Sequence, residues 1–241
     1  FSGLEFPINK IDRKLTRDTL GTRHCDWYFA DHGVLIDTAG RYTTQDSHAA
    51  QDSTAWQGFL GLLRKHRPRR PINGVIVFVS LADLLNQTRT ERNLHARAIK
   101  QRVQELQNQL GMTFPVYVMF TKADLIAGFT EFFDNLSEEE REQVWGISLP
   151  NAPKPSQSPD FDFLGQELRN LSRRLHDRVI GRMQQERDVR RCAAIESFPL
   201  QMENLYQIAE SFVKRTFAQN RFQFQPYLRG VYFSSGTQDG T

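Results

Sequence analysis

The stretch Val34-Leu35-Ile36-Asp37-Thr38-Ala39-Gly40 decides the fold that we expect. Its apolar residues predict a short strand buried on both faces, and the strand ends in an aspartate followed by small residues. An aspartate in that place can hold Mg²⁺ through water, and the glycine lets the backbone come close to a phosphate. Asp37 and Gly40 are therefore candidate nucleotide-binding residues, and Asp37 is the candidate Mg²⁺ residue. The alternative is a strand-to-loop turn with the aspartate as a cap.

Strands and helices alternate around this stretch. The turn Asp31-His32-Gly33 joins two β-rich runs and predicts a tight hairpin. The predicted strands are 25–30, 33–38, 74–80 and 115–121, and the predicted helices between them are 52–66 and 90–110. This alternation predicts an α/β fold with a mostly parallel sheet, in which the hairpin is the antiparallel edge.

The pattern becomes helical after Gly128. Ser137 and Glu140 have the spacing of a helix-capping box, and residues 149–163 form a loop rich in Pro, Ser and Asp. Further on, the predicted elements are a long amphipathic helix over 163–183, a second helix over 200–219 and a last strand from 228. We predict an α/β core of residues 1–128 and 222–241, with a helical lobe of residues 129–221 inserted before the last strand.

The composition excludes several classes of protein. Hydrophobic residues make up 39% and charged residues 24%, the net charge is +3, and there are two cysteines, Cys25 and Cys192. We expect no nucleic-acid partner from so small a charge, and no disulfide framework or zinc site from two distant cysteines. No apolar run is long enough to span a membrane. The chain starts with Phe1-Ser2-Gly3 and not with Met, so we expect a segment of a longer protein.

Two further motifs follow predicted strands. The first, Phe120-Thr121-Lys122-Ala123-Asp124, matches the [NT]-K-x-D pattern of GTPases, in which the carboxylate accepts two N–H bonds from guanine and the Lys stem packs on the base. The second, Ser234-Ser235-Gly236, stands where GTPases place a small-residue loop against the base oxygen. Thr121, Lys122, Asp124, Ser234 and Ser235 are therefore candidate nucleotide-binding residues. Read separately, the first motif is a common helix start and the second a terminal turn. In this order after Asp-Thr-Ala-Gly, they predict a P-loop GTPase-like fold.

The phosphate loop of such a fold is missing from the sequence. No G-x-x-x-x-G-K-[ST] motif occurs in it. In a GTPase-type sheet the strand before that loop lies between the Asp37 strand and the Val75 strand, so both would lack a neighbour there. We expect no bound cofactor in this segment and assign no catalytic residue. Mg²⁺ with GTP or ATP would require the full-length protein.

Several segments resemble one family. These are Asp37-Thr-Ala-Gly-Arg-Tyr42, Thr121-Lys-Ala-Asp-Leu-Ile126 and the closing Ser235-Gly-Thr-Gln-Asp-Gly-Thr241. Together with 2–7 and 21–29 they closely resemble the cytoplasmic region of the TssM (IcmF-like) proteins of bacterial type VI secretion systems. The resemblance covers essentially the whole chain.

The resemblance implies an inner-membrane protein whose transmembrane segments lie outside this chain and whose present domain faces the cytoplasm. It implies a complex with TssL and TssJ that docks the baseplate. The chain would then be a scaffold with a degenerate nucleotide site, or else an active NTPase that changes the secretion complex. Independently of the family, a stand-alone small GTPase is a third hypothesis, which the missing phosphate loop disfavours. Arg169, Arg173 and Arg178 on the long helix are candidate partner-binding residues, and a solvated helix face is the alternative.

Overall fold

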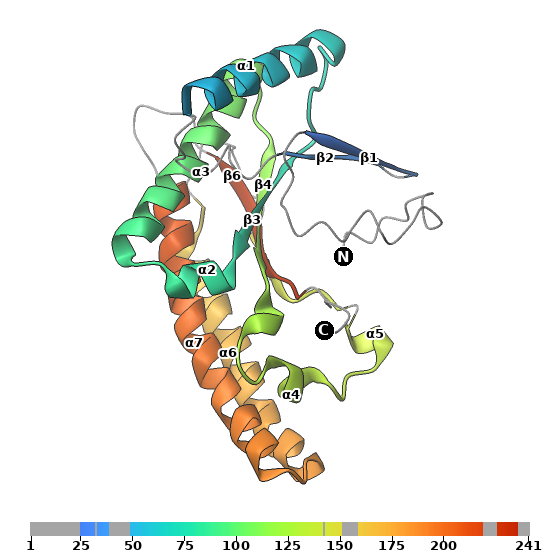
Figure 1. The fold of residues 1–241 in the computed structure, drawn as a ribbon, viewed down its shortest axis with the longest axis vertical. Helices are drawn as coiled ribbons and strands as arrows, with labels where there is room; N and C mark the ends of the chain where they lie inside the picture. The colour runs from blue at the N-terminus through green and yellow to red at the C-terminus, as the bar shows by residue number, and fades with distance from the viewer. Residues whose placement is uncertain are drawn as a thin grey trace. The chain divides into compact units, whose positions relative to one another are not determined.

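The computed structural model describes residues 25–31, 33–38, 49–141, 143–150, 159–218 and 226–235. The chain divides into two compact units, Phe1–Pro68 and Arg69–Thr241 (Figure 1). The described strands form one two-stranded and one four-stranded sheet. The predicted division into a core of 1–128 and 222–241 and a lobe of 129–221 remains a prediction.

The first unit contains a β-hairpin. Strand β1 (Asp26–Ala30) pairs antiparallel with β2 (Gly33–Asp37), and Asp26 lies opposite Asp37. The predicted hairpin is confirmed, and its two strands form a two-stranded sheet. Its place as the edge of the larger sheet remains a prediction. The expected topology needs a strand between β2 and the 74–80 strand, and the described residues contain no such strand through which the hairpin could join.

The same unit contains helix α1 (Ala49–His66). Trp56, Leu60 and Leu63 are buried, as their helical spacing predicts. The last turn is Arg64-Lys65-His66, where positive charge is favourable because it faces the negative end of the helix dipole.

The second unit is built on a four-stranded sheet. Its strands are β3 (Val75–Ser80), β4 (Pro115–Thr121), β5 (Gly146–Ser148) and β6 (Tyr227–Phe233), in the order β3-β4-β6-β5. Strands β3, β4 and β6 are parallel, and β5 is antiparallel to β6. The predicted α/β class with a mostly parallel sheet is confirmed, and the last strand lies in this sheet beside β4. Strand β5 was not predicted because three residues are too few to show a period.

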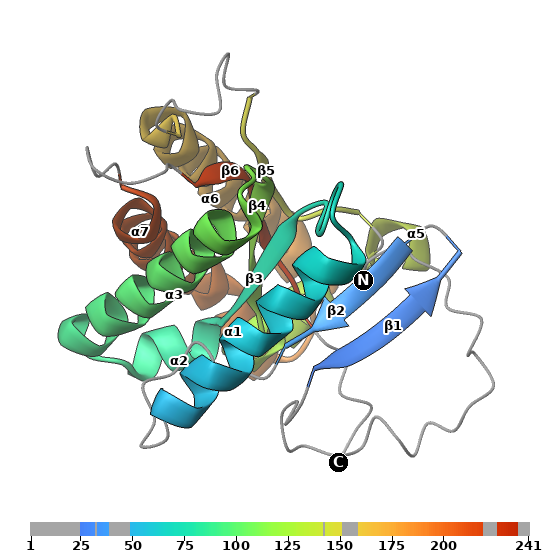
Figure 2. The ribbon, with the colours of Figure 1, turned by 90° about the horizontal axis from the view of Figure 1, so that it is seen from above.

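Helices α2 (Leu81–Asn86) and α3 (Arg89–Leu110) connect β3 to β4. Thr88 and Glu91 form a capping box at the start of α3, and Gly111 ends it in a left-handed conformation. Figure 2 shows α3 on the same side of the sheet as the two long helices that follow.

Those two long helices form an antiparallel pair. Helix α6 (Phe161–Gln185) begins where the carboxylate of Asp160 accepts the backbone N–H of Phe163 at 2.8 Å, and α7 (Val189–Phe217) begins after the cap Asp188. The two helices pack against each other. Helix α7 starts eleven residues before the predicted position of 200 (200 minus 189). Proline usually ends a helix, so the prediction starts this helix after Pro199. In the structure Pro199 lies inside α7, where it and Phe198 are buried, and this packing offsets the hydrogen bond that proline cannot donate.

Two short helices, α4 (Phe129–Phe133) and α5 (Glu138–Arg141), lie between β4 and β5. The predicted capping box is confirmed: the Ser137 N–H donates to the Glu140 carboxylate at 2.9 Å, and the Glu140 N–H donates to the Ser137 hydroxyl at 3.3 Å. The rings of Phe129, Phe133 and Phe198 gather around α4. They fix α4 to α7.

Candidate functional site

The carboxyl ends of three parallel strands meet at one edge of the sheet. Strand β3 ends at Ser80, β4 at Thr121 and β6 at Phe233. In open α/β sheets this edge is where ligands bind. The predicted base-recognition residues follow two of these strands directly: Lys122 to Asp124 after β4, and Ser234 and Ser235 after β6.

Backbone hydrogen bonds join these two segments. The Ser234 N–H donates to the Phe120 carbonyl at 2.8 Å, and the Ala123 N–H donates to the Ser234 carbonyl at 3.2 Å. We call residues 121–124 with 234–235 the base loop. The structure thus brings five of the predicted nucleotide-binding residues together, although more than a hundred residues separate the two segments in sequence.

The backbone turns sharply at Lys122. Its φ is 62° and its ψ is 36°, a left-handed backbone conformation that residues other than glycine rarely adopt. The 3₁₀ turn η3 (Ala123–Leu125) follows, with the Leu125 N–H donating to the Lys122 carbonyl at 3.2 Å. Such strain persists where surrounding contacts hold the residue, and it is frequent at functional sites. Lys122 is exposed, and Asp124 is half-buried in this turn.

Helix α7 supports the chain that leaves the base loop. The Gln201 side-chain amide donates to the Ala127 carbonyl at 3.1 Å. Gly128 has a φ of 85°, and a Cβ on it would lie 2.5 Å from the Ala194 carbonyl oxygen. Only glycine fits so close to α7 in this conformation.

A buried arginine, Arg182, attaches α4 to helix α6. Arg182 of α6 donates from Nε to the Phe132 carbonyl at 2.9 Å, and from Nη2 to the Glu131 carbonyl and the Asp134 carboxylate, each at 2.7 Å. Asp134 also pairs with Arg191 of α7. We call Arg182, Asp134 and Arg191 the clamp. No sequence pattern indicates the clamp, because Asp134 lies 48 residues from Arg182 and 57 residues from Arg191 along the chain.

Asp37 belongs to the first unit. It ends β2 and is exposed. Burial raises the pKa of the Cys25 thiol and of the Tyr28 hydroxyl, and the nearby carboxylates of Asp26 and Asp37 raise both further. The described part of the chain holds no group of three or more His, Cys, Asp or Glu residues that could bind a metal ion. The Mg²⁺ role of Asp37 remains a prediction, and Gly40 lies outside the described residues.

The three predicted partner-binding arginines are exposed on α6, but they do not share one face. Arg169 and Arg173 are four residues apart, whereas Arg178 lies nine residues from Arg169 and so about half a turn around the helix. Arg178 faces α5: the pKa of Glu140 is lowered chiefly by its hydrogen bonds with Ser137 and to a smaller extent by Arg178. Arg169 and Arg173 therefore form a surface separate from Arg178.

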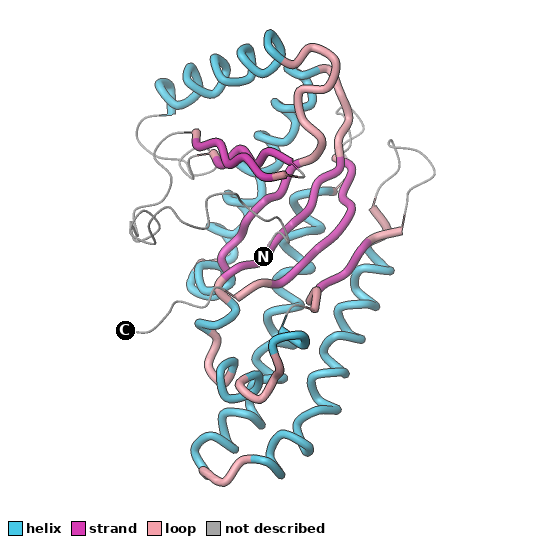
Figure 3. Tube along the Cα trace, turned by 90° about the vertical axis from the view of Figure 1, so that its right-hand side faces the viewer, coloured by secondary structure: helices cyan, strands magenta, loops and turns pink. Residues whose placement is uncertain are grey.

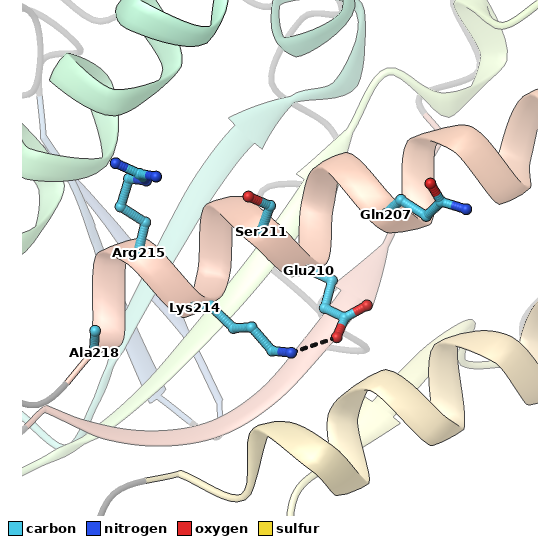
Figure 4. Close-up of a pocket in the computed structure, with 6 residues that line it drawn as sticks. All are labelled: Gln207, Glu210, Ser211, Lys214, Arg215 and Ala218. Carbon is cyan, nitrogen blue, oxygen red and sulfur yellow. Dashed lines mark ion pairs between the residues drawn. The ribbon is translucent and has the colours of Figure 1, made fainter.

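An open groove runs along the last turns of α7 (Figure 4). Its lining residues are Gln207, Glu210, Ser211, Lys214, Arg215 and Ala218. Lys214 and Glu210 form an ion pair of 2.7 Å across consecutive turns. None of the residues predicted for the nucleotide site lines this groove.

Comparison with known proteins decides the family. Residues 49–241 match the model of the IcmF-related N-terminal domain. Over all 241 residues the chain is 48% identical to the type VI secretion system component TssM1 of Pseudomonas aeruginosa. The chain belongs to the IcmF-related family. The resemblance seen in the sequence is thereby confirmed.

This IcmF-related chain spans 22% of the length of TssM1. No solved structure matches it. Within the part of the chain that the structure describes, no helix is both long enough and apolar enough to cross a membrane.

Proposed function

We propose that the chain is a cytoplasmic domain of an inner-membrane component of a type VI secretion system. It acts there as a scaffold that links the membrane complex to the baseplate. The observation that carries this proposal is the 48% identity to TssM1 along the whole chain. TssL and TssJ are the proposed partners in the membrane complex, and the membrane is reached through segments outside these residues.

The proposed docking surface is the face of α6 that carries Arg169 and Arg173. Both side chains are exposed, and they lie one turn apart on the helix. Arginine suits a protein interface because its planar group makes paired hydrogen bonds with carboxylates. The matching surface of the partner would be acidic.

Arg178 supplies a matched control for the test. Full-length protein with Arg169→Glu and Arg173→Glu, and a second variant with Arg178→Glu, would be used to pull down TssL and the baseplate proteins. We expect the double variant to recover at least tenfold less partner protein than the wild type, and Arg178→Glu to recover as much as the wild type. Wild-type recovery by a folded double variant would show that this face is not the docking surface.

We further propose that the base loop is what remains of a GTPase-like nucleotide site within a P-loop-like fold. Support comes from the Thr121–Asp124 and Ser234–Ser235 segments, which the main chain joins at the carboxyl edge of the sheet. In the full-length protein, Asp37 would hold Mg²⁺ through water, Gly40 would face the terminal phosphate and Asp124 would bind guanine.

A second candidate function is an active NTPase whose hydrolysis changes the secretion complex. The strained Lys122 beside Asp124 favours it, because such conformations are frequent at functional sites. GTP hydrolysis by the full-length protein, lost in Asp124→Ala, would support the enzyme. If the full-length protein hydrolyses no nucleotide above background, the scaffold role is the function that stands.

A further inference from the structure

The groove along the last turns of α7 lies wholly within the second unit. Its lining residues recur three or four positions apart, so they form one face of the helix. The eleven residues from Gln207 to Ala218 (218 minus 207) correspond to about 16 Å of helix. Gln207, Ser211 and Ala218 are exposed. Because Ser211 and Ala218 are small, the floor of the groove is low.

Two other helices border this floor. Helices α3 and α6 both pack against α7, and Figure 4 shows α3 on one side of α7 and α6 on the other. Figure 3 shows α6 and α7 side by side. On the α3 side, Lys100 donates from Nζ to the Ala218 carbonyl at 2.8 Å. The groove therefore follows a helix axis and has a helix along each border.

On the α6 side, a glycine lets charged groups of α6 and α7 meet. A Cβ on the buried Gly165 would lie 2.5 Å from Glu210 Oε1 and 3.4 Å from Arg169 Nη1. Arg169, proposed above as a docking residue, therefore borders the groove. Lys214 pairs with Glu210 at 2.7 Å, whereas Arg215 is exposed and points toward α3 (Figure 4). The groove and its borders carry one carboxylate, Glu210, and four cations: Lys100, Arg169, Lys214 and Arg215.

This arrangement of charge and relief indicates the chemistry of the ligand. Cations on both borders attract acidic side chains, and an arginine makes paired hydrogen bonds with a carboxylate. The carboxylate of Glu210 lies between the borders, where it repels a phosphate or the headgroups of an anionic lipid surface. A helix satisfies both conditions, because its acidic side chains can reach the borders while a donor side chain faces Glu210.

We propose that the groove on α7 binds an acidic helix of a partner protein. This inference rests on the proposed scaffold role, and it extends the docking surface from Arg169 and Arg173 on α6 to Arg215 on α7. The partner helix lies along α7, with Asp and Glu side chains toward both borders of the groove.

Site-specific photo-crosslinking in the full-length protein tests the proposal. One variant carries a benzophenone amino acid in place of Gln207, and the control carries it in place of Arg190, which is exposed in the first turn of α7. Each is irradiated with purified TssL and baseplate proteins. We expect position 207 to give at least tenfold more cross-linked partner than position 190. The cross-linked peptide should contain more acidic than basic residues.

Charge reversal tests the same groove without a cross-linker. Arg215→Glu should lower the recovery of partner protein at least tenfold in a pull-down, and Arg190→Glu should recover as much as the wild type. Equal recovery by Arg215→Glu and the wild type would overturn the inference.

The other outcomes separate this inference from the scaffold role. If the wild type recovers its partners but position 207 yields no cross-link to them, the inference fails and the scaffold role stands. If the wild type recovers no partner, both fail. A cross-link from position 207 to lipid, to the same polypeptide or to a basic segment of a partner would also overturn the inference.

Discussion

The position of Asp124 is set by the two residues before it. Lys122 turns the backbone through its left-handed conformation, and the Ala123 N–H donates a hydrogen bond to the Ser234 carbonyl. In the full-length protein we predict that its carboxylate pairs with the two N–H groups of guanine. Asp124→Asn should then shift the preference from guanine toward xanthine nucleotides by tenfold or more. Competition binding with GTP and XTP measures this shift. Equal binding of GTP and ATP by the wild-type protein would show that the base loop does not select a base.

Glu186 gives the tip of the α6–α7 pair a pH dependence. Its carboxylate accepts from Arg191 Nε at 2.7 Å and from the N–H groups of Arg187 and Asp188. The hydrogen bond from Arg191, and then the backbone bonds, lower the pKa of Glu186 from 4.5 to about 2.

The lowered pKa means that the folded state favours the charged form. The contribution to stability is complete above pH 4.5 and is lost as the pH falls toward 2. We predict that at pH 7 the wild-type protein has a higher Tm than the Glu186→Gln variant, and that this difference in Tm shrinks below pH 4.5. A Tm difference that is constant from pH 7 to pH 3 would contradict the assignment.

At the scale of elements, the clamp links α4 to the long helices. Arg182 is buried and has three acceptors on α4 and the residue after it. Arg182→Met should leave the Glu131 and Phe132 carbonyls unpaired and lower the free energy of unfolding by about 2–4 kcal/mol. The exposed Arg190→Met should change it by less than about 0.5 kcal/mol. Urea unfolding compares the two, and equal effects would show that the clamp carries no stability.

The elements differ in how far the sequence predicts them. Local signals such as the Ser137–Glu140 capping box and the apolar spacing of α1 and α6 predicted their elements correctly, because the interactions span one turn. The start of α7 was missed because Pro199 is tolerated only through burial against other elements. The clamp was missed for the same reason: its partners meet only in the folded chain.

At the scale of the whole molecule, the order of the motifs and strands along the chain predicted that the two base-loop segments lie side by side. Parallel strands bring their carboxyl ends to one edge, so motifs that end β4 and β6 become neighbours. The predicted pairing of the hairpin with the larger sheet needs a strand that the described residues do not contain. Asp37 and the base loop lie in different units, and their joint role in a nucleotide site rests on the motif order alone.

The missing phosphate loop leads to a prediction for these 241 residues by themselves. A triphosphate is held chiefly by that loop, and Asp37 can contribute only through a Mg²⁺ ion that the phosphates also bind. Isothermal titration with GTP or ATP in Mg²⁺ buffer should give a Kd above about 100 µM. Micromolar binding of either nucleotide would contradict this prediction.

We propose that the domain serves type VI secretion as a docking scaffold and not through nucleotide turnover. The test is the amount of secretion by cells whose chromosomal gene carries either Asp124→Ala or the double change Arg169→Glu with Arg173→Glu. We predict that Asp124→Ala retains at least half of wild-type secretion, and that Arg169→Glu with Arg173→Glu, at normal protein level, loses at least tenfold. Loss of secretion in Asp124→Ala together with full secretion in the double arginine variant would show that the domain acts through nucleotide turnover and not through this docking surface.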